Sequence, residues 1–171
     1  MPADTRYALM RITVSNSTLP LADYSNEPMP LPGMDPVTIF GGALPDELDF
    51  LAFSDMVNKK SWNISPSLQD IKTVMDKVGA DNTVLSIYFR QPYVIDQASG
   101  IRKARAIVGL FDVDDAALMD VLTCKFNPSG KLPFALADSA KAILRQASDA
   151  PGYAKKDTLY PFGFGLSYPA K

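Results

Sequence analysis

The 171-residue sequence contains no histidine and a single cysteine, Cys124. Without an imidazole, Ser-His-Asp and Cys-His catalysis, histidine proton transfer and most zinc sites are excluded. One thiol can form neither an internal disulfide nor a cysteine cluster around a metal. We therefore expect neither a metal nor a cofactor in this chain.

The sequence also lacks a strong charge and a long apolar run. Its net charge is −2 and its isoelectric point is near 5.0, so we expect no binding to nucleic acid phosphates. No apolar run approaches the roughly 20 residues of a membrane-spanning helix, so we expect no membrane partner. The start Met1-Pro2-Ala3-Asp4 is not typical of a signal peptide, and nothing else in the sequence identifies a compartment.

Glutamate is rare, because only Glu27 and Glu47 occur among the 19 acidic residues. Aspartate suits helix caps and turns, which predicts structural roles for most of the others. Both glutamates lie in or next to a proline-rich stretch, which we interpret as a long loop over residues 15–46. Its prolines forbid a regular helix or a central strand: Pro20, Pro28, Pro30, Pro32, Pro36 and Pro45. A loop of this length in a compact domain is usually functional or disordered.

The rest of the sequence alternates apolar strands with amphipathic helices. Strands are predicted over 7–14, 83–89 and 106–111, and helices over about 67–78 and 114–122. Near-continuous apolar strands separated by helices indicate an α/β protein, with a mostly parallel sheet and helices on both faces. We predict one domain over residues 1–171. No helix precedes the strand at 7–14, so either this strand is an edge or the chain starts partway through a domain, and an edge predicts a homodimer through it.

The boundaries of the two predicted helices have local signals. Ser65 and Pro66 are typical of an N-cap followed by the first helical residue, and Ser67 with Asp70 has the spacing of a capping box. Gly79 predicts the end of that helix. The second helix is predicted to bury one face, made of Ala117, Leu118, Val121 and Leu122.

Three strings together resemble the C-terminal domain of glycoside hydrolase family 3, the β-glucosidase and exo-glucanase family. They are Arg90-Gln91-Pro92-Tyr93-Val94-Ile95, Phe126-Asn127-Pro128-Ser129-Gly130-Lys131-Leu132-Pro133-Phe134, and Asp157-Thr158-Leu159-Tyr160-Pro161-Phe162-Gly163-Phe164-Gly165-Leu166-Ser167-Tyr168. The resemblance runs from about Ser65 to Tyr168 and is looser upstream. We interpret the last two strings as structural, because a turn at 128–130 redirects the chain and glycines between aromatic anchors pin a C-terminal tail. Cys124 stands where the family often has glycine; because a left-handed conformation there would be strained for cysteine, we expect a local departure and no catalytic role.

The resemblance implies retaining hydrolysis of a β-linked glucoside or oligosaccharide by two carboxyl groups about 5–5.5 Å apart. In the family an N-terminal barrel domain supplies a nucleophilic Asp, and a loop of this second domain supplies a Glu acid/base. Nothing in the 171 residues resembles the barrel, so we expect the C-terminal portion of a larger enzyme or a relative that has lost the rest. The compartment of that parent, whether cytoplasmic, periplasmic or secreted, is left open.

Glu47 in Glu47-Leu48-Asp49-Phe50-Leu51 fits the outline of the acid/base segment, with Glu27 as the second choice. Asp46 or Asp49 would orient it or bind a sugar hydroxyl, and a neighbouring carboxylate would raise its pKa. The alternative is that Glu47 is a solvated glutamate at a helix start.

Two further residues are candidates for substrate binding. Trp62 either stacks on a sugar face or anchors the core. Arg90 follows a strand end, where ligands bind in open α/β sheets, or it pairs with a carboxylate. A non-catalytic carbohydrate-binding or protein-interaction module remains the alternative function.

Overall fold

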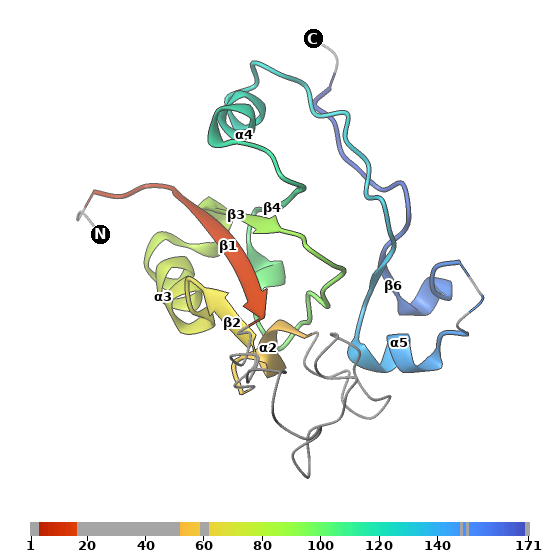
Figure 1. The fold of residues 1–171 in the computed structure, drawn as a ribbon. Coiled ribbons are helices and arrows are strands. Elements are labelled where there is room, and N and C mark those ends of the chain that lie inside the picture. Colours follow the sequence, from red (N-terminus) through yellow and green to blue (C-terminus); the bar gives the residue numbers. More distant parts are fainter. Residues whose placement is uncertain (1–3, 17–51, 59–61, 148, 150, 170–171) are drawn as a thin grey trace, which may run out of the picture.

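The computed structural model describes residues 4–16, 52–58, 62–147, 149 and 151–169. Its elements follow one another from the N-terminal strand to a C-terminal strand and tail (Figure 1). In chain order they are β1 (Ala8–Asn16), α2 (Phe53–Met56), β2 (Trp62–Ser65), α3 (Leu68–Val78), η2 (Ala80–Asn82), β3 (Thr83–Tyr88), η3 (Ile101–Lys103), β4 (Ala106–Leu110), α4 (Asp115–Leu122), β5 (Leu136–Ala137), α5 (Ala140–Arg145), η4 (Lys155–Asp157) and β6 (Thr158–Tyr160). The predicted loop falls, from residue 17 to its end at 46, outside the described residues.

Four strands form the main sheet in the order β2-β1-β3-β4. β1, β3 and β4 are parallel, and β2 runs antiparallel to β1. The predicted α/β class with a mostly parallel sheet is therefore confirmed. The parallel neighbours β3 and β4 are joined by a long connection that contains η3, as parallel pairing requires, whereas α3 joins the antiparallel strand β2 to β3.

One of the two alternatives for the first strand was an edge of the sheet, and the strand order contradicts it because β1 has β2 on one side and β3 on the other. The homodimer through this strand stays a prediction. β1 lies between β2 and β3, since β2 pairs with Thr13 through Asn16 and β3 pairs with Ala8 through Thr13. The edge position was expected because the sequence did not predict the short strand β2. This strand pairs with the C-terminal part of β1, from Thr13 to Asn16. No described strand pairs with the other side of Ala8 to Ile12.

The core lies between one face of this sheet and α3. Ile12, Leu85 and Ile87 of the strands have no exposed surface, and neither has Ile71 of α3. The helix is stabilised at its start by Ser67, whose hydroxyl accepts from the Asp70 amide at 3.1 Å. Ser67 is the N-cap, so the spacing with Asp70 is confirmed, whereas the cap predicted at Ser65 is wrong because β2 extends to that residue.

The second predicted helix, α4, stands clear of the sheet (Figure 1). Only Leu118 of its predicted buried face is buried; Ala117 is exposed, and Val121 and Leu122 are half-buried. Its N-terminal end reaches the other face of the sheet, where Arg11 of β1 forms an ion pair with Asp115. The apolar pattern predicted this helix correctly. It did not predict that, among the described residues, so little of the chain packs against the helix.

The two C-terminal strings run side by side away from the sheet (Figure 1). The Leu132 amide donates to the Phe164 carbonyl at 2.8 Å, and the Gly163 amide donates to the Leu132 carbonyl at 2.9 Å. Asn127 and Tyr168 exchange hydrogen bonds, at 3.3 Å and at 2.8 Å. These bonds support the structural interpretation of the two strings to the extent that the tail is held against residues 127–132.

Cys124 has a left-handed backbone, with φ of 60°, so the backbone itself does not depart from the conformation that glycine would favour at this position. Its thiol contacts the hydroxyl of Tyr168 in the tail. Burial raises the pKa of Tyr168, and the nearby thiol adds to the shift. The thiol of Cys124 thus joins the tail to the end of α4, although the backbone of this residue has a conformation that glycine adopts more readily.

Candidate functional site

The candidate site lies at the C-terminal end of β3, where the chain continues as the loop 89–99. Ligands of open α/β sheets bind outside the carboxyl ends of their strands, which is why the sequence pointed to Arg90. The structure places Arg90 at this end with an exposed side chain. Its backbone hydrogen-bonds the hydroxyl of Tyr93, whose ring is buried, and burial raises the pKa of that hydroxyl. The Arg90 guanidinium works against that shift through its positive charge.

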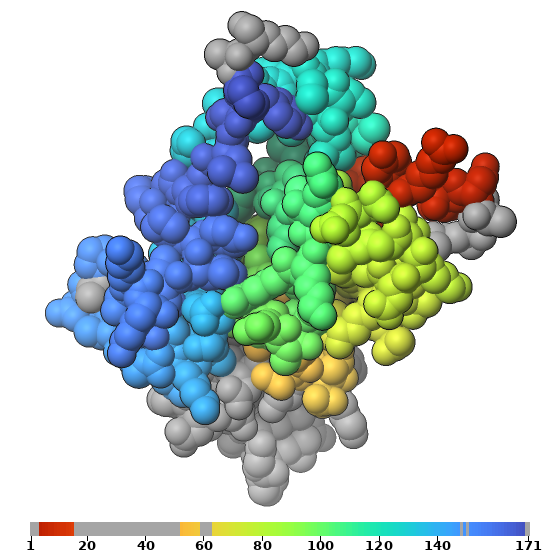
Figure 2. All heavy atoms as spheres, turned by 180° about the vertical axis from the view of Figure 1, so that it is seen from behind, coloured from red at the N-terminus to blue at the C-terminus, as the bar shows by residue number. Residues whose placement is uncertain are grey.

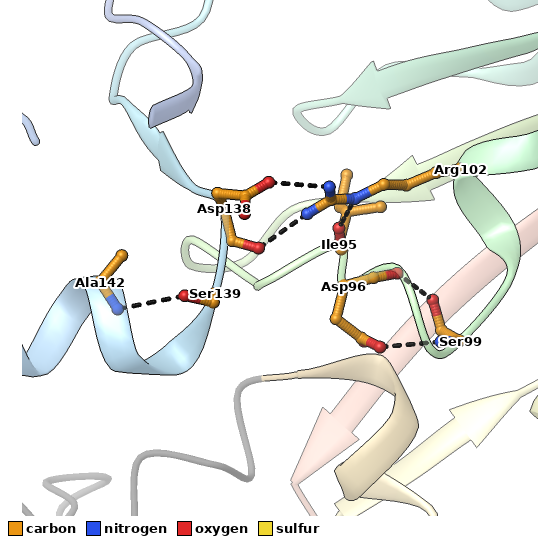
Figure 3. Close-up of polar contacts among 7 residues, drawn as sticks. All are labelled: Ile95, Asp96, Ser99, Arg102, Asp138, Ser139 and Ala142. Carbon is orange, nitrogen blue, oxygen red and sulfur yellow. Dashed lines mark hydrogen bonds and ion pairs between the residues drawn. The ribbon is translucent and has the colours of Figure 1, made fainter. Parts of the chain in front are cut away.

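The same loop is held to the short helix α2 by Asp96. The Asp96 carboxylate accepts from the Ser54 amide at 3.0 Å and from the Ser99 amide at 2.7 Å. The Ser99 hydroxyl also donates to the Asp96 carbonyl at 2.7 Å (Figure 3). A buried carboxylate that accepts hydrogen bonds from backbone amides has a structural role, and here it fixes the start of α2 against the loop.

Arg102 joins this loop to the C-terminal part of the chain. Its guanidinium donates to the Ile95 carbonyl, to the Asp138 carboxylate at 2.8 Å and to the Asp138 carbonyl at 2.7 Å (Figure 3). Asp138 comes directly before Ser139, the N-cap of α5, so the clamp also fixes where that helix begins. The planar, five-donor fork of arginine suits such a three-way contact, which lysine could not reproduce.

A cavity of 640 Å³ lies beside this loop, between Pro92 and the C-terminal lobe, which we define as residues 134–162. Its walls include the side chains of Phe134, Tyr153 and Phe162. From behind, the C-terminal residues lie next to the green residues of the middle of the chain (Figure 2). The loop after β3 thus borders both the anchored start of α2 and this cavity.

The residues predicted for catalysis lie outside the described residues. This holds for Glu47, Asp46 and Asp49, and for the second choice Glu27. Trp62 is the first residue of β2, and only its backbone is described. The described residues therefore do not test whether a predicted carboxylate lies near Arg90, and the roles of all these residues stay predictions.

Sequence reasoning missed the polar residues that hold the loop, Asp96, Arg102 and Asp138. Each lies in an ordinary loop or short turn with no periodic signal, and their partners are up to 42 residues away in the sequence. A hint existed in the string Asp96-Gln97-Ala98-Ser99, because aspartate three residues before serine is typical of a local turn. Its link to α2 could not be predicted from that pattern.

The part of the chain that the structure describes offers no group of three or more metal-binding side chains. Among the same residues, no helix combines the length and the apolar character that crossing a membrane requires.

Comparison with known proteins matches residues 32–168 to the family described as glycosyl hydrolase family 3 C-terminal domain. Over 106 residues the chain is 33% identical to the periplasmic β-glucosidase/β-xylosidase of Dickeya chrysanthemi, covering 62% of this chain and 15% of that protein. Over 86 residues it is 35% identical to a probable β-glucosidase C of Aspergillus flavus and 33% identical to β-glucosidase C of Emericella nidulans, in both cases 50% of this chain and 13% of the relative.

The chain therefore spans only a small part, about 15% or less, of the length of these relatives. The family match, in contrast, covers most of the chain, including the loop after β3 and both C-terminal strings. The chain belongs to the glycosyl hydrolase family 3 C-terminal domain family.

Proposed function

We propose that this chain forms the acid/base side of a retaining β-glucosidase-type active site. The nucleophilic carboxylate would come from the barrel domain of a parent enzyme, and the substrate would be a β-linked glucoside or oligosaccharide. The observation that carries this proposal is the family match over residues 32–168, a range that includes Glu47 and Arg90. The relatives, named β-glucosidases, support the choice of substrate.

In this proposal Glu47 protonates the leaving oxygen and then activates water, and Asp46 or Asp49 raises its pKa into the range that an acid needs. Retention requires the Glu47 carboxyl about 5–5.5 Å from the nucleophile. Arg90 and Trp62 would line the sugar site.

The anchoring of α2 supports the pairing of Glu47 with the loop after β3. Ala52 forms a bridge with Val94, and the Phe53 amide donates to the Val94 carbonyl at 3.2 Å. Because Glu47 lies five positions before Ala52, a fully extended chain would put its Cα at most about 18 Å from that anchor. The Asp96 contact to Ser54 fixes the same point, so the described chain at 52–54 is held against the loop that carries Arg90.

The direct test is a chimera in which this chain replaces the corresponding part of the Dickeya chrysanthemi enzyme. We expect it to hydrolyse aryl β-glucosides and cellobiose. Glu47→Gln should reduce hydrolysis of cellobiose about 10²-fold or more, because its alcohol leaving group needs a proton, and should reduce hydrolysis of a dinitrophenyl glucoside far less. Glu27→Gln is the matched control, since it removes the other glutamate of the chain.

The isolated chain gives the complementary result. Because it carries the acid/base and lacks the nucleophile, the isolated chain should fold and yet release no product from an aryl β-glucoside. Turnover that is lost in Glu47→Gln would contradict the proposal, because a second carboxylate would then have to lie within this chain.

A further inference from the structure

Asp96 is a buried carboxylate in the loop that carries Arg90, and the proposed chemistry does not use it. The residue is 9% exposed, and none of the ion pairs among the described residues includes it. A buried carboxylate without a cation is costly, because burial removes the water that solvates its charge. Hydrogen bonds to its two oxygens offset this cost.

The two oxygens of Asp96 have different partners. Oδ1 accepts from the amide of Ser99 at 2.7 Å, and the Ser99 hydroxyl donates to the Asp96 carbonyl at 2.7 Å (Figure 3). Oδ2 accepts from the amide of Ser54, 42 residues away in the sequence, at 3.0 Å. One oxygen thus closes a local turn, and the other joins the loop to α2.

The local turn alone does not require a carboxylate at position 96. Asparagine and serine each have an acceptor oxygen that suits the same turn, and neither carries a charge that burial would penalise. Only a carboxylate offers a second acceptor oxygen. The contact to Ser54 is therefore what distinguishes aspartate from these residues at this position.

The contact to Ser54 belongs to a joint between residues 52–54 and the loop. Ala52 bridges Val94, and the Phe53 amide donates to the Val94 carbonyl at 3.2 Å. The rings of Phe53 and Tyr93 meet edge to face with centroids 6.0 Å apart, and both are buried. A substitution of either ring would disturb the core, whereas the Asp96 carboxylate can be changed at a single atom.

We propose that Asp96 is a positioning residue for glycoside cleavage, because its bond to Ser54 fixes residues 52–54, which follow Glu47 in the chain, against the loop that carries Arg90. This inference rests on the proposed function, in which Glu47 and Arg90 belong to one site. A proton donor has to lie within hydrogen-bond distance of the leaving oxygen, and a misplacement of about 1 Å can slow a reaction about 10²-fold. Without the bond to Ser54, protonation of the leaving oxygen slows and substrate binding changes little.

The contact itself is tested in the full chain by amide hydrogen exchange. Asp96→Asn keeps one acceptor oxygen and replaces the other by a donor group. The Ser99 amide should stay protected, since the hydroxyl bond also holds its turn, and the Ser54 amide should lose protection about tenfold. Asp114→Asn is the matched control, because the Asp114 carboxylate accepts from the amide of Ala117, three residues later, at 2.8 Å. Equal protection of the Ser54 amide in the two variants would overturn the proposal.

The effect on the reaction is tested in the chimera by measuring kcat and KM for cellobiose and for a dinitrophenyl glucoside. Asp96→Asn should lower kcat for cellobiose about tenfold and keep KM within about twofold. The dinitrophenyl glucoside should be nearly unaffected, because its leaving group needs no proton. Ser99→Ala is the control within the turn, since it removes the hydroxyl bond to the Asp96 carbonyl and leaves the carboxylate bond to Ser54. The proposal is overturned if both substrates slow equally, if only KM changes, or if Ser99→Ala has the same effect.

Two further variants distinguish positioning from a role in folding alone. In the Glu47→Gln background, Asp96→Asn should lower the ratio of cellobiose to dinitrophenyl glucoside hydrolysis no further, because the group that it positions is already absent. A further fall of the same size as in the wild type would contradict the proposal. Asp96→Ser, which also has a single acceptor oxygen, should repeat the selective fall of Asp96→Asn. If both variants lose protection at the Ser99 amide, Asp96 serves folding alone and the proposal is overturned.

The same ratio separates this proposal from the proposed function. A fall in Glu47→Gln with an unchanged ratio in Asp96→Asn overturns the positioning role alone. A fall in Asp96→Asn with an unchanged ratio in Glu47→Gln overturns the assignment of Glu47 and means that Asp96 positions a different proton donor. An unchanged ratio in both variants overturns both proposals.

Discussion

Replacing Gly165 by alanine should detach the C-terminal tail. A Cβ at Gly165 would lie 2.3 Å from the carbonyl oxygen of Gly130, and that neighbour is backbone, which cannot move aside cheaply. The paired segments would have to separate at the point where the two strings meet. Three hydrogen bonds depend on this approach: Leu132 amide to Phe164 carbonyl, Gly163 amide to Leu132 carbonyl, and Lys131 Nζ to Gly165 carbonyl.

The expected loss of stability follows from those bonds. At about 1 kcal/mol for each backbone bond, and less for the exposed Lys131, the total is about 2–3 kcal/mol. Leu132 and Tyr160 also pack against the core, so separation of the segments reaches the folded body of the protein. The free energy of unfolding should therefore fall, and the Leu132 and Gly163 amides should lose protection from hydrogen exchange.

Two neighbouring glycines serve as controls in the same urea denaturation series. Gly130→Ala should change the free energy of unfolding by less than about 0.5 kcal/mol, because its Cβ meets nothing within 4 Å and no positive φ is involved. Gly163→Ala has equal space but φ of 77°, so it should cost about 1–2 kcal/mol. The reasoning fails if Gly165→Ala and Gly130→Ala have the same stability.

The remaining predictions concern three other positions. Cys124→Gly should raise the free energy of unfolding, measured in urea, by about 1 kcal/mol, since glycine adopts φ of 60° without strain. If stability does not rise, the lost thiol contact to Tyr168 offsets the relief of backbone strain. Arg102→Met should lower the free energy of unfolding by about 3 kcal/mol, because Asp138 and the Ile95 carbonyl lose a charged donor. Arg102→Lys should recover only part of this loss, and full recovery by lysine would refute the argument from the arginine fork. Burial raises the pKa of Tyr93, so folded Tyr93 should ionise above pH 10, and the stability due to its neutral form should be complete below about pH 10 and decline as pH rises further. Absorbance titration of wild type against Tyr93→Phe checks this, and a Tyr93 component at or below pH 10 would contradict it.

The sequence was informative where a local pattern decides the structure. The apolar spacing of Leu68, Ile71 and Met75 predicted α3 because those side chains share one helical face, and Gly79 ended the helix as expected.

Features that depend on distant partners were not predictable in this way. β2 is four residues long and is defined only by its pairing with β1, about 50 residues earlier. The exposure of α4 depends on what surrounds it, which no periodic pattern reveals. Asp96 and Arg102 have structural roles because the fold brings Ser54 and Asp138 to them, and neither partner is marked in the sequence. The acid/base role of Glu47 rests, in the sequence, on the short motif Glu47-Leu48-Asp49-Phe50-Leu51 alone.

The central claim is that Glu47 supplies the proton in a family 3 active site. Its most direct test is the ratio of cellobiose to dinitrophenyl glucoside hydrolysis in the chimera, compared between Glu47→Gln and Glu27→Gln. We predict that Glu47→Gln lowers this ratio about 10²-fold and that Glu27→Gln leaves it unchanged. An unchanged ratio in Glu47→Gln, or a fall of the same size in Glu27→Gln, would contradict the assignment.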